Sequence, residues 1–211
     1  MTTVLLFGDS NTHGTMPMSA LGERRRYGRD QRWSGHLARA LPDVVFIEEG
    51  QPGRTTVHDD PVEGAHRNGL RVLPALLESH RPIDLLVIML GTNDMKTRFA
   101  VTGFDVALSL ERLADVVKAS KAGPGQGVPK LLLIAPPPVR EAGCLAGMFE
   151  GGAAKSANLA GHLAEAAARC GAAFLDGGAH IAVSPLDGVH FEPEAHAALG
   201  AAVAAAVRPL I

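Results

Sequence analysis

Short apolar runs alternate with stretches of helical periodicity along the whole chain, and this alternation limits the possible folds most strongly. Five runs fit β-strands, at residues 4–7, 44–47, 85–90, 131–135 and 173–175. Several of them are apolar at every position, as strands buried on both faces of a parallel sheet are. Strands that alternate with helices build βαβ units. We therefore predict an α/β fold, a three-layer α/β/α sandwich with a five-stranded parallel sheet.

Helices are expected between these strands. The clearest covers residues 103–121, where Val106, Leu110, Leu113 and Val117 recur at helical spacing. Four more are predicted at 34–41, 69–80, 153–170 and 193–207. The chain has 211 residues and no internal repeat, so we expect one domain over residues 1–211.

Composition and charge limit the kinds of partner that the protein is expected to bind and the cellular compartment in which it is expected. The chain has 20 Lys and Arg against 22 Asp and Glu, a net charge of -2. Binding to nucleic acid or to an anionic membrane surface is therefore not expected. No apolar run reaches the ~18 residues of a membrane-spanning helix, and the first residues do not form a secretory signal. Two cysteines, Cys144 and Cys170, do not make a disulfide framework. We predict a cytoplasmic protein with free thiols.

Polar, glycine-containing segments directly follow the first three predicted strands, at residues 8–14, 49–56 and 91–94. A fourth such segment, at residues 187–190, lies in the longer stretch after the fifth strand. In an open parallel sheet, functional side chains gather in the loops at the carboxyl ends of the strands. These four segments are therefore the candidates for a shared site.

The residue types in these segments suit nucleophilic catalysis. A serine hydroxyl becomes reactive when a histidine takes its proton and a carboxylate orients that histidine. Ser10, His190 and Asp187 provide this set, and a spacing of three lets Asp187 reach one ring nitrogen of His190. Acyl transfer also needs donors for an oxyanion. The backbone N–H groups of Ser10 and Gly53 and the side-chain amide of Asn93 are the candidates.

Taken in order, the segments resemble the motif blocks of the SGNH, or GDSL, hydrolase superfamily, which is named after a Ser, a Gly, an Asn and a His. These residues match Ser10, Gly53, Asn93 and His190. The blocks themselves read Gly8-Asp9-Ser10-Asn11-Thr12-His13-Gly14, Gly91-Thr92-Asn93-Asp94 and Asp187-Gly188-Val189-His190. Longer stretches are similar to the bacterial arylesterase and acyltransferase subgroup.

The resemblance implies a flavodoxin-like sheet and a serine esterase that cleaves short-chain aryl esters through an acyl-enzyme, with acyl transfer to alcohols or peroxide as a further outcome. It also implies no cofactor, no metal and a closed homo-oligomer, often an octamer. His13 and Gly53 stand where similar proteins carry tryptophan and alanine. Substrate contacts are expected from Asn11, His13, Phe149 and Val189.

Three alternatives remain open at this stage. A carbohydrate O-acetyl esterase would use the same fold and the same residues. A flavodoxin-like carrier would hold the phosphate of FMN in residues 10–15, although the chain offers few aromatic residues for stacking, 7 Phe, 1 Trp and 1 Tyr. A metal-dependent phosphoesterase would use Asp9, Asn93 and His190, but the spacing of the nine histidines does not match zinc-ligand pairs.

Residues 139–152 lead to an expectation about assembly. They follow Pro136-Pro137-Pro138 and contain Leu145, Met148 and Phe149, which we expect to be buried against a neighbouring subunit or over the active-site mouth. A second contact is expected around residues 24–27 and 32–33. Lys96 is expected at the pocket rim or in solvent.

Overall fold

A computed structural model describes residues 1–211 and contains one sheet of five parallel strands in the order β2-β1-β3-β4-β5. This confirms the predicted α/β sandwich. The strands are β1 (Thr2–Gly8), β2 (Val44–Gly50), β3 (Leu85–Met89), β4 (Lys130–Ala135) and β5 (Ala173–Asp176).

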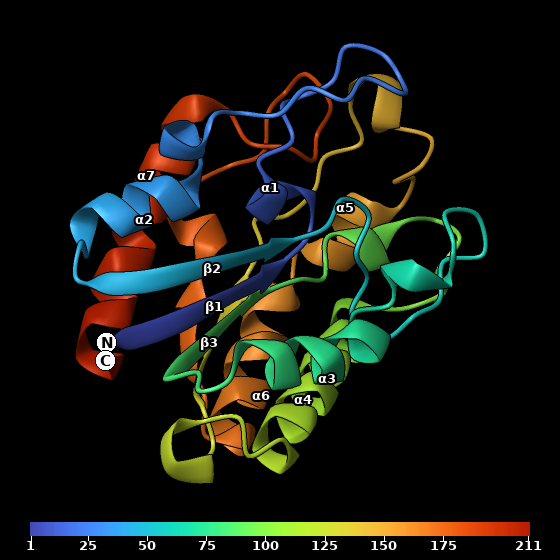
Figure 1. Cartoon of the computed structure of the whole chain (residues 1–211). Helices are drawn as coiled ribbons and strands as arrows, with labels where there is room; N and C mark the ends of the chain where they lie inside the picture. Colours follow the sequence, from blue (N-terminus) through green and yellow to red (C-terminus); the bar gives the residue numbers. More distant parts are fainter.

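Helices cover both faces of the sheet (Figure 1). On one face lie α2 (Trp33–Ala40) and α7 (Pro193–Val207), and on the other lie α3 (Gly69–His80), α4 (Gly103–Ala119) and α6 (Leu159–Cys170). Two short helices, α1 (Ser10–His13) and α5 (Gly152–Ser156), lie in loops. Single 3₁₀ turns occupy Arg29–Gln31, Ala65–Arg67, Asn93–Met95, Pro124–Gln126, Gly143–Leu145, Gly177–Ala179 and Arg208–Leu210.

The predicted helix over 153–170 is in fact two helices, α5 and α6. Asn158 separates them with non-helical angles of φ -104° and ψ 4°. Asparagine competes for nearby backbone hydrogen bonds and so favours helix boundaries. The apolar periodicity continues across the break, which is why the sequence pattern does not reveal it.

Each layer of helices encloses its own hydrophobic core. All five residues of β3 are buried, and consecutive ones, such as Leu86 and Val87, point to opposite faces and belong to different cores. The α4 helix begins at a capping box, in which Thr102 and Asp105 satisfy each other's backbone N–H groups. None of the helices combines the length and apolar character needed to cross a membrane.

The order of the strands creates a crevice at one edge of the sheet. From β1 the chain passes to β2 on one side, and β3 then pairs with the other side of β1. Gly8, the last residue of β1, lies opposite both Gly50 and Met89. The loops after β1, β2 and β3 therefore begin side by side at the point where the strand order reverses, which is the usual place for a ligand site in this architecture.

The apolar residues that were expected to contact a neighbouring subunit are instead buried within this chain. Leu145 is 5% exposed and Phe149 is 1% exposed, and both belong to the core under α4 and α6. Tyr27 and Trp33, from the second expected contact, are also buried. Of the two places expected for residues 139–152, the structure shows the second, because the loop folds back onto its own chain and Leu145 and Phe149 line a pocket there. These residues therefore do not support the prediction of an oligomer.

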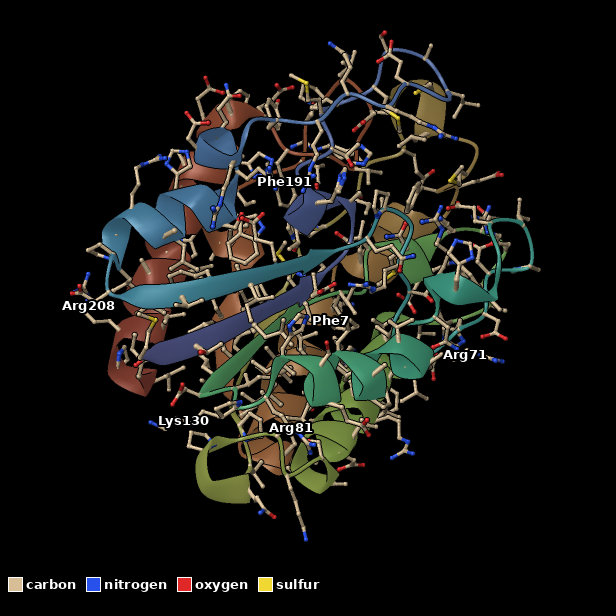
Figure 2. The ribbon with its side chains drawn as sticks, in the orientation of Figure 1. Phe7, Arg71, Arg81, Lys130, Phe191 and Arg208 are labelled. Atoms are coloured by element: carbon tan, nitrogen blue, oxygen red, sulfur yellow. The ribbon has the colours of Figure 1, made fainter.

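Charged side chains lie mainly on the outside of the molecule. Figure 2 shows Arg71, Lys130 and Arg208 at the outline of the molecule, and Arg81 is exposed as well. Both cysteines, Cys144 and Cys170, are free, as predicted.

Candidate active site

A tight turn after β1 presents Ser10. The Asp9 side chain accepts a hydrogen bond from the Asn11 N–H at 2.9 Å and thereby caps the single turn of α1. The turn ends at Gly14, whose N–H donates to the Ser10 carbonyl at 2.9 Å. Ser10 is 5% exposed, and its side chain lines a pocket.

Ser10, His190 and Asp187 form one chain of hydrogen bonds. The Ser10 Oγ lies 3.1 Å from His190 Nε2, and His190 Nδ1 lies 2.6 Å from Asp187 Oδ2. All three side chains are buried, and 180 residues separate the serine from the histidine in sequence. Because Nδ1 donates to the carboxylate, Nε2 of the neutral ring is free to accept the serine proton.

The Asp187 carboxylate also holds its own loop. Its Oδ1 accepts hydrogen bonds from the N–H groups of Val189 and His190 at 3.0 Å, and its Oδ2 accepts one from Met18 at 2.9 Å. Burial alone raises the pKa of Asp187, but the hydrogen bonds and charge of His190 lower this pKa below its ordinary value. Asp187 is therefore ionised when it orients His190.

The three residues that the sequence analysis named as oxyanion donors, Ser10, Gly53 and Asn93, all line the pocket. The Ser10 N–H lies at the start of α1, before the first intrahelical hydrogen bond. The Gly53 N–H has no partner within the chain, and Gly53 has a φ of +77°, a conformation that favours glycine. Asn93 Nδ2 donates to the Arg54 carbonyl at 3.1 Å and lies 3.4 Å from Asp9 Oδ2. Its second hydrogen is therefore only weakly engaged.

Three buried ionisable residues, Asp9, Asp94 and Arg54, lie next to the residues of the site. Burial raises the pKa of Asp9 from 3.8 to about 6, and it does the same to Asp94, which accepts hydrogen bonds from Thr56. Arg54 lies over the Phe7 ring at 4.2 Å and donates to the carbonyls of Gly8 and Glu49. Burial lowers its pKa to about 10. Arg54 remains a cation at neutral pH and ties the ends of β1 and β2 together.

The pocket has a volume of about 690 Å³ and opens beside Ser10. Its walls include three residues expected to contact substrate, namely His13, Phe149 and Val189. Asn11 is a correction, because its side chain lies outside the pocket and donates to the Val189 carbonyl at 3.1 Å. This bond links the turn that carries Ser10 to the loop that carries His190, so Asn11 has a positioning role.

His13 gives the pocket a neutral polar wall. Its Nδ1 lies 3.1 Å from Thr15 Oγ1. Burial, together with the charges of Arg26 and Arg32, lowers its pKa from 6.5 to about 4. His13 is therefore an uncharged imidazole at neutral pH.

Three further charged residues, Glu63, Arg67 and Lys96, line the pocket, and sequence patterns did not identify the first two as site residues. Glu63 and Arg67 lie in residues 57–68 and line the pocket together with Lys96. Lys96 follows Asn93 by three residues, lies on the pocket wall and is 2% exposed. Glu63 and Arg67 form an i, i+4 ion pair in the structure, but no strand or helix period in the sequence places them near Ser10.

Comparisons with known proteins agree with this geometry. Residues 6–198 match the GDSL-like Lipase/Acylhydrolase family. The native aryl esterase of M. smegmatis is 38% identical over the full length of both chains, with a TM-score of 0.95. A carbohydrate acetylesterase from Sinorhizobium meliloti has the same identity, coverage and TM-score. A lipase/acylhydrolase from Enterococcus faecalis, at 20% identity over 99% of this chain and 96% of its own, shares the fold with a TM-score of 0.69. Among curated proteins, none matches the sequence significantly.

Proposed function

The chain belongs to the GDSL-like lipase/acylhydrolase family and is a carboxylic ester hydrolase, and from this premise we propose that Ser10, His190 and Asp187 are its catalytic triad. The observation that supports the proposal most strongly is the continuous chain of hydrogen bonds from the Ser10 hydroxyl through His190 to the buried Asp187 carboxylate. It opens into a pocket that has room for a small ester.

In the first half of the proposed reaction, the Ser10 Oγ attacks the ester carbonyl carbon while His190 Nε2 takes the hydroxyl proton. The carbonyl oxygen becomes an oxyanion, which accepts hydrogen bonds from the N–H groups of Ser10 and Gly53 and from the Asn93 amide. His190 then gives the proton to the leaving alcohol as the C–O bond breaks. The acyl group remains on Ser10 as an ester.

In the second half, water enters on the side that the alcohol has left. His190 takes a proton from the water, which attacks the acyl carbonyl, and the carboxylic acid leaves as Ser10 recovers its proton. An alcohol or hydrogen peroxide in place of water gives a new ester or a peracid. This outcome needs only a nucleophile that fits beside His190.

The proposed substrates are aryl esters with short acyl chains. Leu145, Phe149 and Val189 form an apolar part of the pocket that suits an aromatic ring or a few methylene groups. One similar protein is described as an aryl esterase and another as a carbohydrate acetylesterase. A direct comparison of phenyl acetate with an acetylated sugar tests which alcohol this enzyme prefers, and we expect phenyl acetate. A flavodoxin-like FMN carrier is not favoured, because residues 6–198 match an acylhydrolase family.

We further propose that the enzyme works in the cytoplasm, because the two free thiols, Cys144 and Cys170, suit a reducing compartment. Fractionation of cells, with detection of the enzyme in each fraction, tests this proposal.

Labelling with a fluorophosphonate tests the proposed nucleophile directly, because this reagent forms a covalent bond with an activated serine. We expect a single modification that maps to Ser10 by mass spectrometry and is absent from Ser10→Ala. Ser109→Ala is a matched control, since this buried hydroxyl donates to the Asp105 carbonyl within α4. Labelling that persists in Ser10→Ala, or that maps to another serine, would contradict the assignment.

A further inference from the structure

One wall of the pocket is charged, although the catalytic chemistry described above does not use its charges. Lys96, Arg67 and Glu63 line the pocket, and Asp60 and Arg98 lie behind them. Glu63 Oε1 lies 2.6 Å from Lys96 Nζ and 2.6 Å from Arg98 Nη2. Burying a charge costs free energy unless the charge is paired or binds a ligand. The presence of these charges in the pocket wall therefore needs an explanation.

Lys96 is the most buried of the cations. Its side chain is 3% exposed and makes one hydrogen bond, to Glu63 at 2.6 Å. The next carboxylate oxygen, of Asp60, lies 3.6 Å away, beyond hydrogen-bond distance. An ammonium group has three N–H donors. Two of them therefore have no acceptor within the chain, and the side chain lies on the pocket wall.

Arg67 has free donors beside the oxyanion donor Gly53. Its Nη1 donates to the Pro52 carbonyl, whereas its buried Nε has no hydrogen-bond partner and lies 3.6 Å from Glu63 Oε2. A β-carbon on Gly53 would lie 3.2 Å from Arg67 Nε and 2.5 Å from Glu63 Oε2. The charged wall is thus adjacent to the place where the ester carbonyl must bind.

The charges of this wall do not cancel. Three cations, Lys96, Arg67 and Arg98, face two carboxylates, Asp60 and Glu63, so the wall retains one positive charge. Glu63 is surrounded by the three cations, which offset its repulsion of an anion. Unused N–H donors and a residual positive charge are the features that bind a carboxylate.

On the basis of the proposed esterase function, we propose that the pocket selects esters that carry a carboxylate group, bound by Lys96 and Arg67. The carboxylate can belong to the acyl part or to the alcohol part, because both extend from the carbonyl carbon that Ser10 attacks. This preference would distinguish the enzyme from one that accepts only neutral aryl esters.

Two pairs of substrates test the inference. The first pair is 4-acetoxybenzoate and its methyl ester, which carry the charge or its neutral equivalent on the alcohol part. The second is phenyl hydrogen glutarate and its methyl ester, which differ in the same way on the acyl part. Release of the phenol gives kcat/KM for each, and the measured quantity is the ratio of the anion to its neutral partner.

We expect Lys96→Met and Arg67→Gln each to lower this ratio about tenfold relative to the unmodified enzyme, in one pair or in both. The pair that responds identifies the part of the ester that carries the charge. Lys118→Gln is the matched control, because it removes one positive charge from an exposed position on α4 and should leave both ratios unchanged. Arg67 is partly exposed, so its variant keeps the test available if Lys96→Met does not fold.

Unchanged ratios in both pairs and both variants would overturn the inference while leaving the esterase function intact. Failure of the esterase function has a different signature. In that case the unmodified enzyme would release no phenol from either neutral ester, or the release would persist in Ser10→Ala.

Discussion

At the scale of single residues, the members of the proposed triad act as a unit, because the hydroxyl of Ser10 is reactive only while His190 can take its proton. We expect Ser10→Ala and His190→Ala each to lower kcat for phenyl acetate by roughly 10³-fold or more. Circular dichroism and thermal unfolding should show a folded protein in both cases. Turnover by Ser10→Ala close to that of the unmodified enzyme, in protein free of other esterases, would contradict the assignment.

Asn93 should matter less than Ser10, because in the proposed mechanism the backbone N–H groups of Ser10 and Gly53 still bind the oxyanion when the Asn93 amide is removed. We expect Asn93→Ala to lower kcat by about 10²-fold to 10³-fold. The effect should appear in kcat and not in KM, since the amide binds charge that develops only in the transition state. Steady-state kinetics with phenyl acetate measure both constants, and an unchanged kcat would remove Asn93 from the oxyanion site.

The sequence predicts the residues of the site unevenly. Ser10, Asn93 and His190 lie in short segments with recognisable chemistry, so their grouping could be predicted from their places after the strands. Lys96 was expected at the pocket rim or in solvent, and it lies on the pocket wall. Glu63 and Arg67 could not be placed from the sequence, because they come from an irregular segment whose path depends on tertiary contacts. Asn11 was misassigned for a related reason. Its neighbour in space, the Val189 carbonyl, is 178 residues away in sequence.

At the scale of structural elements, the loop after β5 depends on Gly188. This residue has a φ of +75°, and a β-carbon there would lie 2.0 Å from the Arg140 carbonyl oxygen. We expect Gly188→Ala to displace the loop that carries Asp187 and His190, so that kcat for phenyl acetate falls by about 10²-fold or more and the melting temperature falls as well.

Gly147→Ala, in the loop of residues 139–152, provides the matched glycine-to-alanine control. No atom lies within 4 Å of a β-carbon at Gly147, and its backbone is outside the left-handed region. The control should therefore keep both kcat and the melting temperature. Equal behaviour of the two variants would show that the strain at Gly188 does not position the catalytic loop.

Elements with strong periodicity could be predicted from sequence, and irregular ones could not. The predicted boundaries of α3 and α7 agree with the structure, because Asn68 caps α3 and Pro193 begins α7. The strand predicted at residues 44–47 was too short, since β2 continues through the polar residues Glu48 and Glu49 to Gly50. Pairing with β1 extends β2 there, and this pairing is a tertiary interaction that no local pattern reveals.

At the scale of the whole molecule, assembly stays a prediction from the family resemblance. Leu21 is 66% exposed at the mouth of the pocket, where a neighbouring subunit could cover it. We expect light scattering at micromolar concentration to give a mass above the 22.0 kDa of one chain, and Leu21→Asp to lower it. Leu108→Asp, which changes another exposed leucine on α4, serves as the control. A single species of 22.0 kDa before any substitution would contradict the prediction.

The pH dependence of stability is also a property of the whole molecule, because buried acids and bases act on it in opposite directions. Burial raises the pKa of Asp9 from 3.8 to about 6, so the folded state holds a proton that the unfolded state has lost between these values. The stability that Asp9 contributes is full below pH 3.8 and is lost as pH rises through 6. Burial lowers the pKa of His196 to about 4, so His196 removes stability as pH falls from 6.5 to 4.

Asp9→Asn separates these two effects, because it removes one titration and leaves His196 unchanged. We expect the free energy of unfolding of Asp9→Asn, relative to that of the unmodified protein, to increase by about 2 kcal/mol between pH 4 and pH 7.5. Denaturant unfolding at the two pH values measures this difference. Asp43→Asn, at an exposed position, is the control for the loss of one carboxylate. If the difference in unfolding free energy between Asp9→Asn and the unmodified protein were the same at both pH values, Asp9 would titrate alike in the folded and unfolded states. Burial of its carboxylate would then have little cost.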